Sequence, residues 1–454
     1  MHVEFRNLTP FDGLCFPTID RDGRRNRVFV MKAGYRLRPR AGGQVSLQVI
    51  DDEPLPLCLA DSYYGEPGTS SVCAESDLAP GKPRCDVVIV GSSYAPRGQP
   101  SPHWLARVRV SRPLPPVSPP EIPLPYGLAP NMLPSSAQLE QWRREVTRAE
   151  QAWSARTTHE ALLDKTLRIH GPRHFKKAMF NRWQVSDAEP VIEAPLRWEE
   201  AWGGRSTVSS HSTIPGDSSY ALDEVCFSNP LGRGWLEERQ LKLASKDSPL
   251  SVADGMPAPR FEYPQAPISA PSIATHPEPP LDALTMAEIA SGYGVTPAGF
   301  GWVGRSWAPR LARAGRYDEH WLESRWPQLP ESFDAGYWNG APDDQQIVFP
   351  PTDARIELWH LLPPDFSDRE GLAVIDLPGH RPFVLLRLHN GVPLPLHLSI
   401  DTMVVDTQAL VLALTCRVCI SENVEVRTAE LRFEVDPGAP LVRAAPIPVS
   451  LEET

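Results

Sequence analysis

The sequence predicts a mainly β protein, built of sandwich- or barrel-like β-domains, with a long inserted helix that makes the fold α+β overall. Short runs rich in β-branched and aromatic residues, bounded by Gly, Pro, Asp and Ser, recur in both halves of the chain. Proline accounts for 51 of the 454 residues, about twice its usual share of roughly 5%, and proline interrupts helices. A single long stretch, residues 135–164, combines helical periodicity with the absence of glycine and proline.

The first part of the chain is expected to be β-rich. Four runs have the composition of strands: Arg27–Arg36, Val45–Ile50, Asp86–Val90 and Trp104–Val110. In the last run the residues alternate, so Val108 and Val110 face one side while Arg107 and Arg109 face the other. Strand character returns at Lys165–Ile169 and Val191–Trp198. The expected N-terminal β-rich domain therefore has two parts, residues 1–111 and 165–243.

Residues 112–164 form an expected insertion made of a proline-rich spacer and a helix. Nine prolines fall between Arg112 and Pro134, which predicts a stiff, extended spacer of the polyproline type. A helix can begin at Ser135 or Ser136, because a serine there caps it. If the helix continues to about Asp164, it spans about 28 residues, or roughly 42 Å.

One face of the expected helix is apolar. Leu139, Trp142, Val146, Ala149 and Trp153 recur at spacings of three and four residues, a narrow coiled-coil-like seam, and the other faces are charged. Because an isolated amphipathic helix is marginally stable in water, this seam must be covered. Two alternatives are open: the seam packs on the β-domain of its own chain, or it presents Leu139, Trp142, Val146 and Trp153 to a protein partner or a second copy.

The C-terminal part of the chain is again expected to be β-rich. Residues 244–296 are rich in Pro and Ser and predict a connection that can hold a short helix at Leu281–Ala290. Residues 297–454 follow as a C-terminal β-rich domain. Its expected strands are Ala354–Leu361, Gly371–Asp376, Phe383–Leu388, Leu396–Val405, Ala409–Ile420 and Val424–Val435.

Charge and hydropathy narrow the class of partners. The chain has 45 Lys and Arg against 56 Asp and Glu, a net charge of −11, which disfavours a protein that binds the phosphate backbone of nucleic acids. No apolar signal segment is visible at the N-terminus, and no apolar run approaches the roughly 20 residues of a membrane helix. Seven cysteines, an odd number, fit reduced thiols. We expect a soluble, cytoplasmic protein that binds neither nucleic acid nor membranes.

Motifs for catalysis, cofactors or metals are weak. The sequence contains no dinucleotide fingerprint, phosphate-binding loop, GxSxG or HExxH motif. Cys416 and Cys419 lie three residues apart in an expected strand, so they point to opposite faces. His170 and His174 flank a Gly-Pro pair, which excludes the helix on which this spacing binds metal. We therefore expect no catalytic residue, cofactor or metal.

Acidic residues beside tryptophan keep one enzymatic alternative open. The two groups are Glu199 and Glu200 with Trp202, and Asp318 and Glu319 with Trp321. Two suitably spaced carboxylates and a sugar-stacking tryptophan would serve a carbohydrate- or envelope-acting hydrolase on a β-scaffold. The same residues are equally compatible with structural packing.

A series of short motifs, in a fixed order, resembles a known family. In the first half the motifs are Phe5–Phe11, Val28–Ala33, Ser76–Pro83, Asp86–Gly91, Tyr94–Gly98, Gly171–Arg173, Trp198–Gly204 and Ser228–Gly234. In the second half they are Pro297–Phe300, Trp307–Arg310, Ala314–Asp318 with Trp321, Arg325–Pro327, Leu329–Pro330, Phe333–Asp334, Tyr337–Pro342, Asp344–Gln346 and Asp401–Thr402. From about Phe5 to Arg417, the chain resembles the bacterial family "domain of unknown function 2169", found in type VI secretion gene clusters.

The resemblance implies an accessory role in secretion. Such proteins resemble cytoplasmic adaptors or chaperones that bind a toxic effector, often one with a PAAR-type domain, and promote its loading onto the secretion spike. A structural component of the secretion machinery is the other alternative. The family supplies no catalytic residues, and Asp77, Asn339 and Asp344 in its motifs could either cap loops or line a groove. The insertion of residues 112–164 is a departure from the family pattern, in which the strand at Trp104–Val110 passes quickly to the next.

Overall fold

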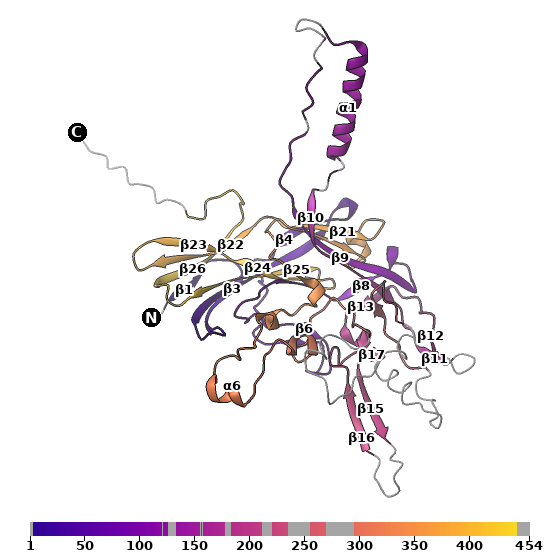
Figure 1. Cartoon of the computed structure of the whole chain (residues 1–454), viewed down its shortest axis with the longest axis vertical. Coiled ribbons are helices and arrows are strands. Elements are labelled where there is room, and N and C mark those ends of the chain that lie inside the picture. The colour runs from indigo at the N-terminus through magenta and orange to yellow at the C-terminus, as the bar shows by residue number, and fades with distance from the viewer. Residues whose placement is uncertain are drawn as a thin grey trace, which may run out of the picture.

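The largest element of the computed structural model is a twelve-stranded sheet curled into a half-barrel (Figure 1). The structure describes residues 3–119, 121–125, 133–154, 156, 158–177, 183–210, 220–234, 255–268 and 295–442. The order of the strands across the sheet is β18 (Phe261–Glu262), β10 (His159–His170), β9 (His103–Pro113), β20 (Arg355–Trp359), β21 (Leu372–Asp376), β4 (Gln44–Val49), β3 (Arg25–Pro39), β25 (Val411–Ser421), β24 (Ser399–Asp406), β7 (Cys85–Val90) and β19 (Gln346–Ile347), with β2 (Asp12–Ile19) also paired to β3. The predicted mainly β fold is confirmed.

A second sheet of four strands packs against the first. Its order is β1 (Glu4–Asn7), β26 (Val426–Glu434), β22 (Arg381–Leu388) and β23 (Pro393–His397). Apolar side chains of both sheets share one core, in which Phe29 and Met31 of β3 join Leu386 of β22 and Leu431 of β26. Burying this apolar surface between two sheets is what stabilises a sandwich-like body.

Strands from both halves of the sequence alternate within the large sheet. Strand β3 pairs with β25 over eleven residues from Asn26 to Arg36, β9 pairs with β20, and β7 pairs in parallel with β24. The expected boundary between an N-terminal and a C-terminal β-domain therefore runs through the middle of one sheet. The physical reason is that local sequence patterns identify strands, whereas strand pairing is set by contacts between residues far apart in the chain.

The alternation predicted for the strand before the insertion is confirmed in β9. Val108 and Val110 are fully buried, and on the opposite face the Arg107 guanidinium contacts the Asp164 carboxylate of β10 at 2.5–2.6 Å. One face of the strand thus contributes to the core, and the other face carries partly exposed charge pairs with β10 and β20.

The inserted helix is shorter than expected. Helix α1 spans Ser136–Ser154, so the predicted continuation to about Asp164 is wrong. The reason is strand pairing: from His159 onward the chain belongs to β10, which is hydrogen-bonded to β9 from the pair His159–Pro113 to the pair His170–His103. Within the described residues the other α-helices are short, α5 (Ala308–Leu311) and α6 (Glu319–Ser324), and none is long and apolar enough to cross a membrane.

Pairs of short strands complete the body. They are β5 (Ser62–Tyr63) with β6 (Val72–Ala74), β8 (Ser92–Tyr94) with β13 (Glu193–Pro195), β11 (Phe175–Lys177) with β12 (Trp183–Val185), β14 (Trp202–Gly203) with β17 (Arg233–Gly234), and β15 (Arg205–Ser210) with β16 (Tyr220–Val225). Most of the expected connection 244–296, including the short helix at Leu281–Ala290, lies outside the described residues. Its described part, residues 255–268, supplies β18 at the edge of the large sheet.

Candidate functional site

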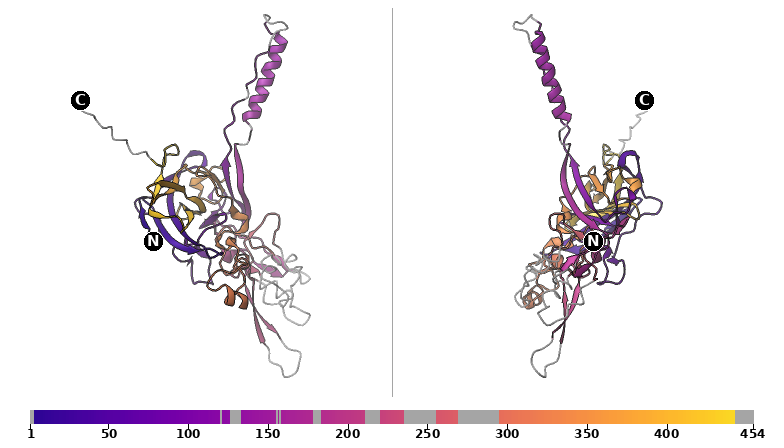
Figure 2. Two further views of the ribbon diagram at one scale, coloured as in Figure 1. Left: turned by 60° about the vertical axis from the view of Figure 1, so that its left-hand side comes forward. Right: turned by 90° about the vertical axis from the view of Figure 1, so that its right-hand side faces the viewer.

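The most distinctive feature outside the sheets is an arm that stands away from the body (Figures 1 and 2). We define the arm as residues 114–158, the connection between β9 and β10. At its base Pro113 pairs with His159, and the Leu114 amide donates to the Thr158 carbonyl at 2.8 Å. The proline-rich segment leads outward and α1 returns beside it. The arm is therefore the greatly enlarged loop of a β-hairpin.

Two tryptophans of α1 hold the proline-rich segment in place. The Trp142 indole N–H donates to the Ile122 carbonyl at 3.1 Å, and the Trp153 indole N–H donates to the Val117 carbonyl at 3.2 Å. The two tryptophans are eleven residues apart, about 16 Å along a helix at about 1.5 Å per residue. The two carbonyls are five residues apart, about 16 Å along a polyproline helix at about 3.1 Å per residue. The matching lengths explain how one segment can satisfy both indoles.

All four residues predicted to bind a partner lie on this seam. Leu139, Trp142, Val146 and Trp153 are each half-buried, and no residue of α1 is fully buried. The seam faces the proline-rich segment, not the β-sheet body, so the expectation that it packs on the β-domain is wrong. Neither alternative includes the arrangement in the structure, in which the proline-rich segment just before the helix packs on the seam.

Large apolar side chains on the arm remain in contact with solvent. The exposed fractions are 39% for Leu114, 59% for Val117, 61% for Leu124 and 91% for Leu133. These four side chains belong to the proline-rich segment and to the residues just before α1. Sequence reasoning missed them because it treated the segment as a spacer. The signal was present as apolar residues placed between prolines, where no sheet or helix can bury them.

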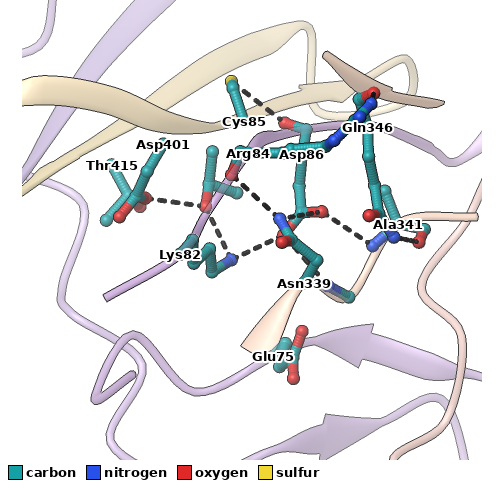
Figure 3. A network of polar contacts seen from close by, with 12 residues as sticks. Glu75, Lys82, Arg84, Cys85, Asp86, Asn339, Ala341, Gln346, Asp401 and Thr415 are labelled. Atoms are coloured by element: carbon teal, nitrogen blue, oxygen red, sulfur yellow. Dashed lines mark hydrogen bonds and ion pairs between the residues drawn. The ribbon is translucent and has the colours of Figure 1, made fainter. Parts of the chain in front are cut away.

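A buried polar network joins several of the ordered motifs (Figure 3). Its centre is the Asp86 carboxylate, which is fully buried on β7. It accepts hydrogen bonds from the Asn339 side-chain amide at 3.0 Å and from the backbone amides of Gly340 at 3.0 Å and Ala341 at 3.1 Å. The Lys82 ammonium contacts the same carboxylate at 2.7 Å. One aspartate thus ties two loops to the sheet.

Lys82 extends this network to β24 and β25. Its ammonium also donates to the Thr402 hydroxyl at 2.8 Å, and the neighbouring Asp401 pairs with the Arg417 guanidinium at 2.7 Å. Burial lowers the pKa of Lys82, but the carboxylates of Asp86 and Asp401 outweigh it and raise the pKa overall. Burial raises the pKa of Asp401, which Arg417 and Lys82 partly oppose. Two cations and two carboxylates balance one another here.

A cavity of about 250 Å³ lies beside the network, between β24, β25 and the loop that carries Asp77. Its walls are largely apolar, and Asp77 is one of the charged residues that line it, with Lys32, Glu75 and Asp406. The Asp77 carboxylate contacts the Lys32 ammonium at 2.5 Å and accepts from the Thr415 hydroxyl at 2.9 Å and the Cys58 amide at 2.8 Å. Asp77 therefore both lines a cavity and fixes a loop, the two roles that the sequence left open.

Asp344 is an exposed partner of a second polar centre, formed around the buried Lys165 ammonium. Its carboxylate and the Gln345 side-chain carbonyl accept from the Lys165 ammonium at 2.8 and 2.7 Å, and the Gly299 carbonyl accepts the third hydrogen bond at 2.7 Å. Burial lowers the pKa of Lys165, against the effect of Asp344. All three N–H groups of the ammonium are satisfied, so Lys165 pins two loops to β10.

Most of the residues considered for metal binding or sugar hydrolysis either have hydrogen-bond or ion-pair partners of their own or are buried. His170 lies 2.9 Å from the Glu262 carboxylate, and Cys416 is buried while Cys419 is exposed on the same strand. Trp202 is almost fully buried, and Glu200 pairs with Arg233 at 3.0 Å. The remaining contacts of this kind are Glu199 with the Ser71 amide, Asp318 with the Trp321 amide, and Glu200 with Arg260. Among the described residues, no group of three potential metal ligands converges.

These features define a mainly β protein in which one interleaved sheet, fastened by buried ion pairs, carries a projecting arm. The chain belongs to the family described as an uncharacterized protein conserved in bacteria, DUF2169, whose sequence model matches residues 22–116 and 145–417. No curated protein and no solved structure matches the chain. The model leaves residues 117–144 unmatched, so the departure from the family pattern is shorter than the expected insertion of residues 112–164; its described residues, 117–119, 121–125 and 133–144, belong to the arm.

Proposed function

We propose that this protein is a cytoplasmic, non-enzymatic adaptor or chaperone that binds a type VI secretion effector and promotes its loading onto the secretion spike. Effectors that carry a PAAR-type domain are the first candidates, as the family resemblance suggests. The observation that carries the proposal is the arm: it stands clear of the body, and it leaves Leu114, Val117, Leu124 and Leu133 uncovered. Exposed apolar patches mark protein–protein interaction sites, although other exposed apolar side chains, among them Leu59, Leu322 and Trp326, lie on the body.

The physical mechanism would be holding and shielding. The rigid β-body supplies a scaffold, and the arm would cover an apolar segment of the effector until the spike takes it up. The net charge of −11 favours a basic cargo, because opposite charges accelerate encounter and disfavour wrong partners. No chemical step is required of the adaptor in this scheme.

An arm-deletion variant provides the test. Replacing residues 114–158 by Asn-Gly joins β9 to β10 by a two-residue hairpin turn, at the point where Pro113 already pairs with His159. Tagged intact and armless proteins are expressed in the native host, and captured proteins are identified by mass spectrometry. Circular dichroism and urea unfolding first verify that the armless body retains its fold.

We expect the intact chain, but not the armless variant, to recover one effector encoded near it. Recovery by both forms would keep the adaptor function and move its binding surface to the β-body. If neither form recovers a secretion protein, the adaptor proposal is wrong. If the protein itself appears in the secreted fraction at the stoichiometry of the spike, it is a structural component of the machinery and not an adaptor.

A further inference from the structure

Most described residues of the proline-rich segment are exposed. Among residues 113–119 and 121–125, only Pro113, Ile122 and Pro125 are partly buried, and the others are exposed. Pro113 belongs to β9 and pairs with His159, whereas Ile122 and Pro125 lie three residues apart, one turn of a polyproline-II helix. In such a helix Ile122 and Pro125 share one ridge with the exposed Pro116 and Pro119, and the described residues of the two other ridges are all exposed.

Helix α1 supports this segment and restricts its conformation. Proline fixes the backbone φ angle near the polyproline value, and the two indole hydrogen bonds, to the carbonyls of Val117 and Ile122, attach the segment to α1 at two points. A ligand that is already in its bound conformation loses less entropy when it binds. The exposed ridges are thus held in advance in the shape that proline-recognising grooves accept.

The chemistry of the free ridges suits such a groove. One free ridge carries Leu114, Val117 and Pro123, and the other carries Pro115 and Leu124. At the base, Arg112 pairs with Glu160 at 2.7 Å with both side chains about half exposed, and such surface pairs contribute little to stability. The Arg112 guanidinium can therefore exchange this partner for a carboxylate at the rim of a groove.

We propose that residues 112–119 and 121–125, supported by α1, form a polyproline-II ligand for an aromatic-lined groove on a partner protein. Domains that bind proline-rich ligands use such grooves, with apolar pockets for the ridges and a polar rim. The inference rests on the proposed function only in taking the cargo, or a domain attached to it, as the owner of the groove. The presentation of the ligand is a property of this chain alone.

The test uses an isolated SH3 domain as a defined proline-binding groove. Binding of the full chain is measured by isothermal titration calorimetry, and an SH3 variant whose groove tryptophan is replaced by alanine is the control for groove occupancy. The matched protein variants are Leu114→Ser/Pro115→Ala, with one change on each free ridge, and Arg144→Ala on the exposed outer face of α1. Tryptophan fluorescence and helical circular dichroism verify that the arm is retained.

We expect the full chain to bind the SH3 domain but not its groove variant, and the ridge double variant to bind about tenfold or more weakly. Arg144→Ala should bind as the unmodified chain does. The inference is overturned if the full chain fails to bind, or if the ridge variant binds as tightly as the unmodified chain.

The same double variant separates the two proposals in the native host. If the cargo is lost from both the armless protein and the ridge variant, the ridges bind the cargo. If the cargo is lost only from the armless protein, the adaptor function stands and the role of the ridges in cargo binding is refuted. If no form captures an effector, the adaptor proposal falls, and the SH3 measurement alone decides whether the arm presents a polyproline ligand.

Discussion

Replacing Asp86 by asparagine should destabilise the whole body, because this carboxylate joins two loops to the sheet. The substitution keeps the size of the side chain and one oxygen. An oxygen that takes the place of Oδ1 can still accept from Asn339 and Ala341, at 3.0 and 3.1 Å in the native protein. The new amide nitrogen takes the place of Oδ2, which now accepts from Lys82 at 2.7 Å and from the Gly340 amide at 3.0 Å. The Lys82 ammonium and the Gly340 amide, both hydrogen-bond donors, would then face the introduced side-chain NH2, which is also a donor.

The magnitude follows from burial. Removing one partner of a buried ion pair costs about 3–5 kcal/mol, because the other charge remains buried without its partner. The Gly340 amide would lose its acceptor as well, and an unsatisfied buried donor costs about 1–3 kcal/mol. Asp401 remains near Lys82 and still favours its charged form, which offsets part of the loss. We therefore expect a decrease of about 3–5 kcal/mol in the free energy of unfolding.

Urea unfolding followed by tryptophan fluorescence measures this decrease. The matched control is Asp376→Asn, which removes an exposed partner of Arg355 on the large sheet and should change stability by less than about 1 kcal/mol. The double variant Lys82→Met/Asp86→Asn removes both charges, so it should lose less than the two single variants added together. If Asp86→Asn lowers the unfolding midpoint no more than Asp376→Asn does, the network does not fasten the body as we infer.

Two further predictions concern the arm and the edge of the large sheet. Replacing Trp142 and Trp153 by phenylalanine removes the indole N–H donors to Ile122 and Val117 while retaining apolar rings, so α1 should lose about 1–2 kcal/mol of protection and its hydrogen-bonded amides should exchange faster; unchanged exchange in α1 would show that the indole hydrogen bonds do not stabilise the arm. For Glu262, burial raises the pKa, but its hydrogen bonds to His170 and the Ile268 amide and the charge of Arg173 outweigh burial and lower it from 4.5 to about 2. Because the folded-state pKa is lowered, its stabilisation is present above pH 4.5 and is lost as the pH falls from 4.5 towards 2. Melting temperatures between pH 6 and pH 3 should therefore fall less steeply for Glu262→Gln than for the unmodified protein, and equal slopes would contradict this assignment.

Local patterns in the sequence identified the secondary structure better than its connections. Alternation at Arg107–Val110 predicted which side chains of β9 are buried, since a strand that faces a core on one side must alternate. The pairing between β3 and β25, more than 370 residues apart, leaves no pattern in the sequence of either strand. The predicted boundary between two β-domains therefore falls within one continuous sheet. The sequence likewise does not show that the Asp86 carboxylate is buried, because an aspartate in a turn-rich motif is equally compatible with a loop cap.

The end of α1 shows how strand pairing between distant residues can override a local signal. Between Ser154 and Asp164 the sequence lacks both glycine and proline, so nothing local stops the helix. What ends it is the ladder between β9 and β10, whose first pair joins residues on either side of the arm. A gain of many cross-strand hydrogen bonds and the burial of Leu163 and Leu167 outweigh a few further residues of exposed helix, whose propensity alone is a weak preference.

The position of the arm explains how a large insertion leaves the body intact. Its two ends lie side by side at the Pro113–His159 pair, so the chain enters and leaves the sheet as in a tight hairpin. The entropic cost of closing a loop rises only slowly with length, by about 0.6 kcal/mol for each doubling, and α1 offsets part of it by packing its seam on the proline-rich segment. Because the apolar seam of α1 packs on the proline-rich segment of the same arm, the arm needs no packing surface on the sheet beyond the Pro113–His159 pair. A partner surface can therefore be lengthened or altered on the arm while the buried charges that fasten the body remain untouched.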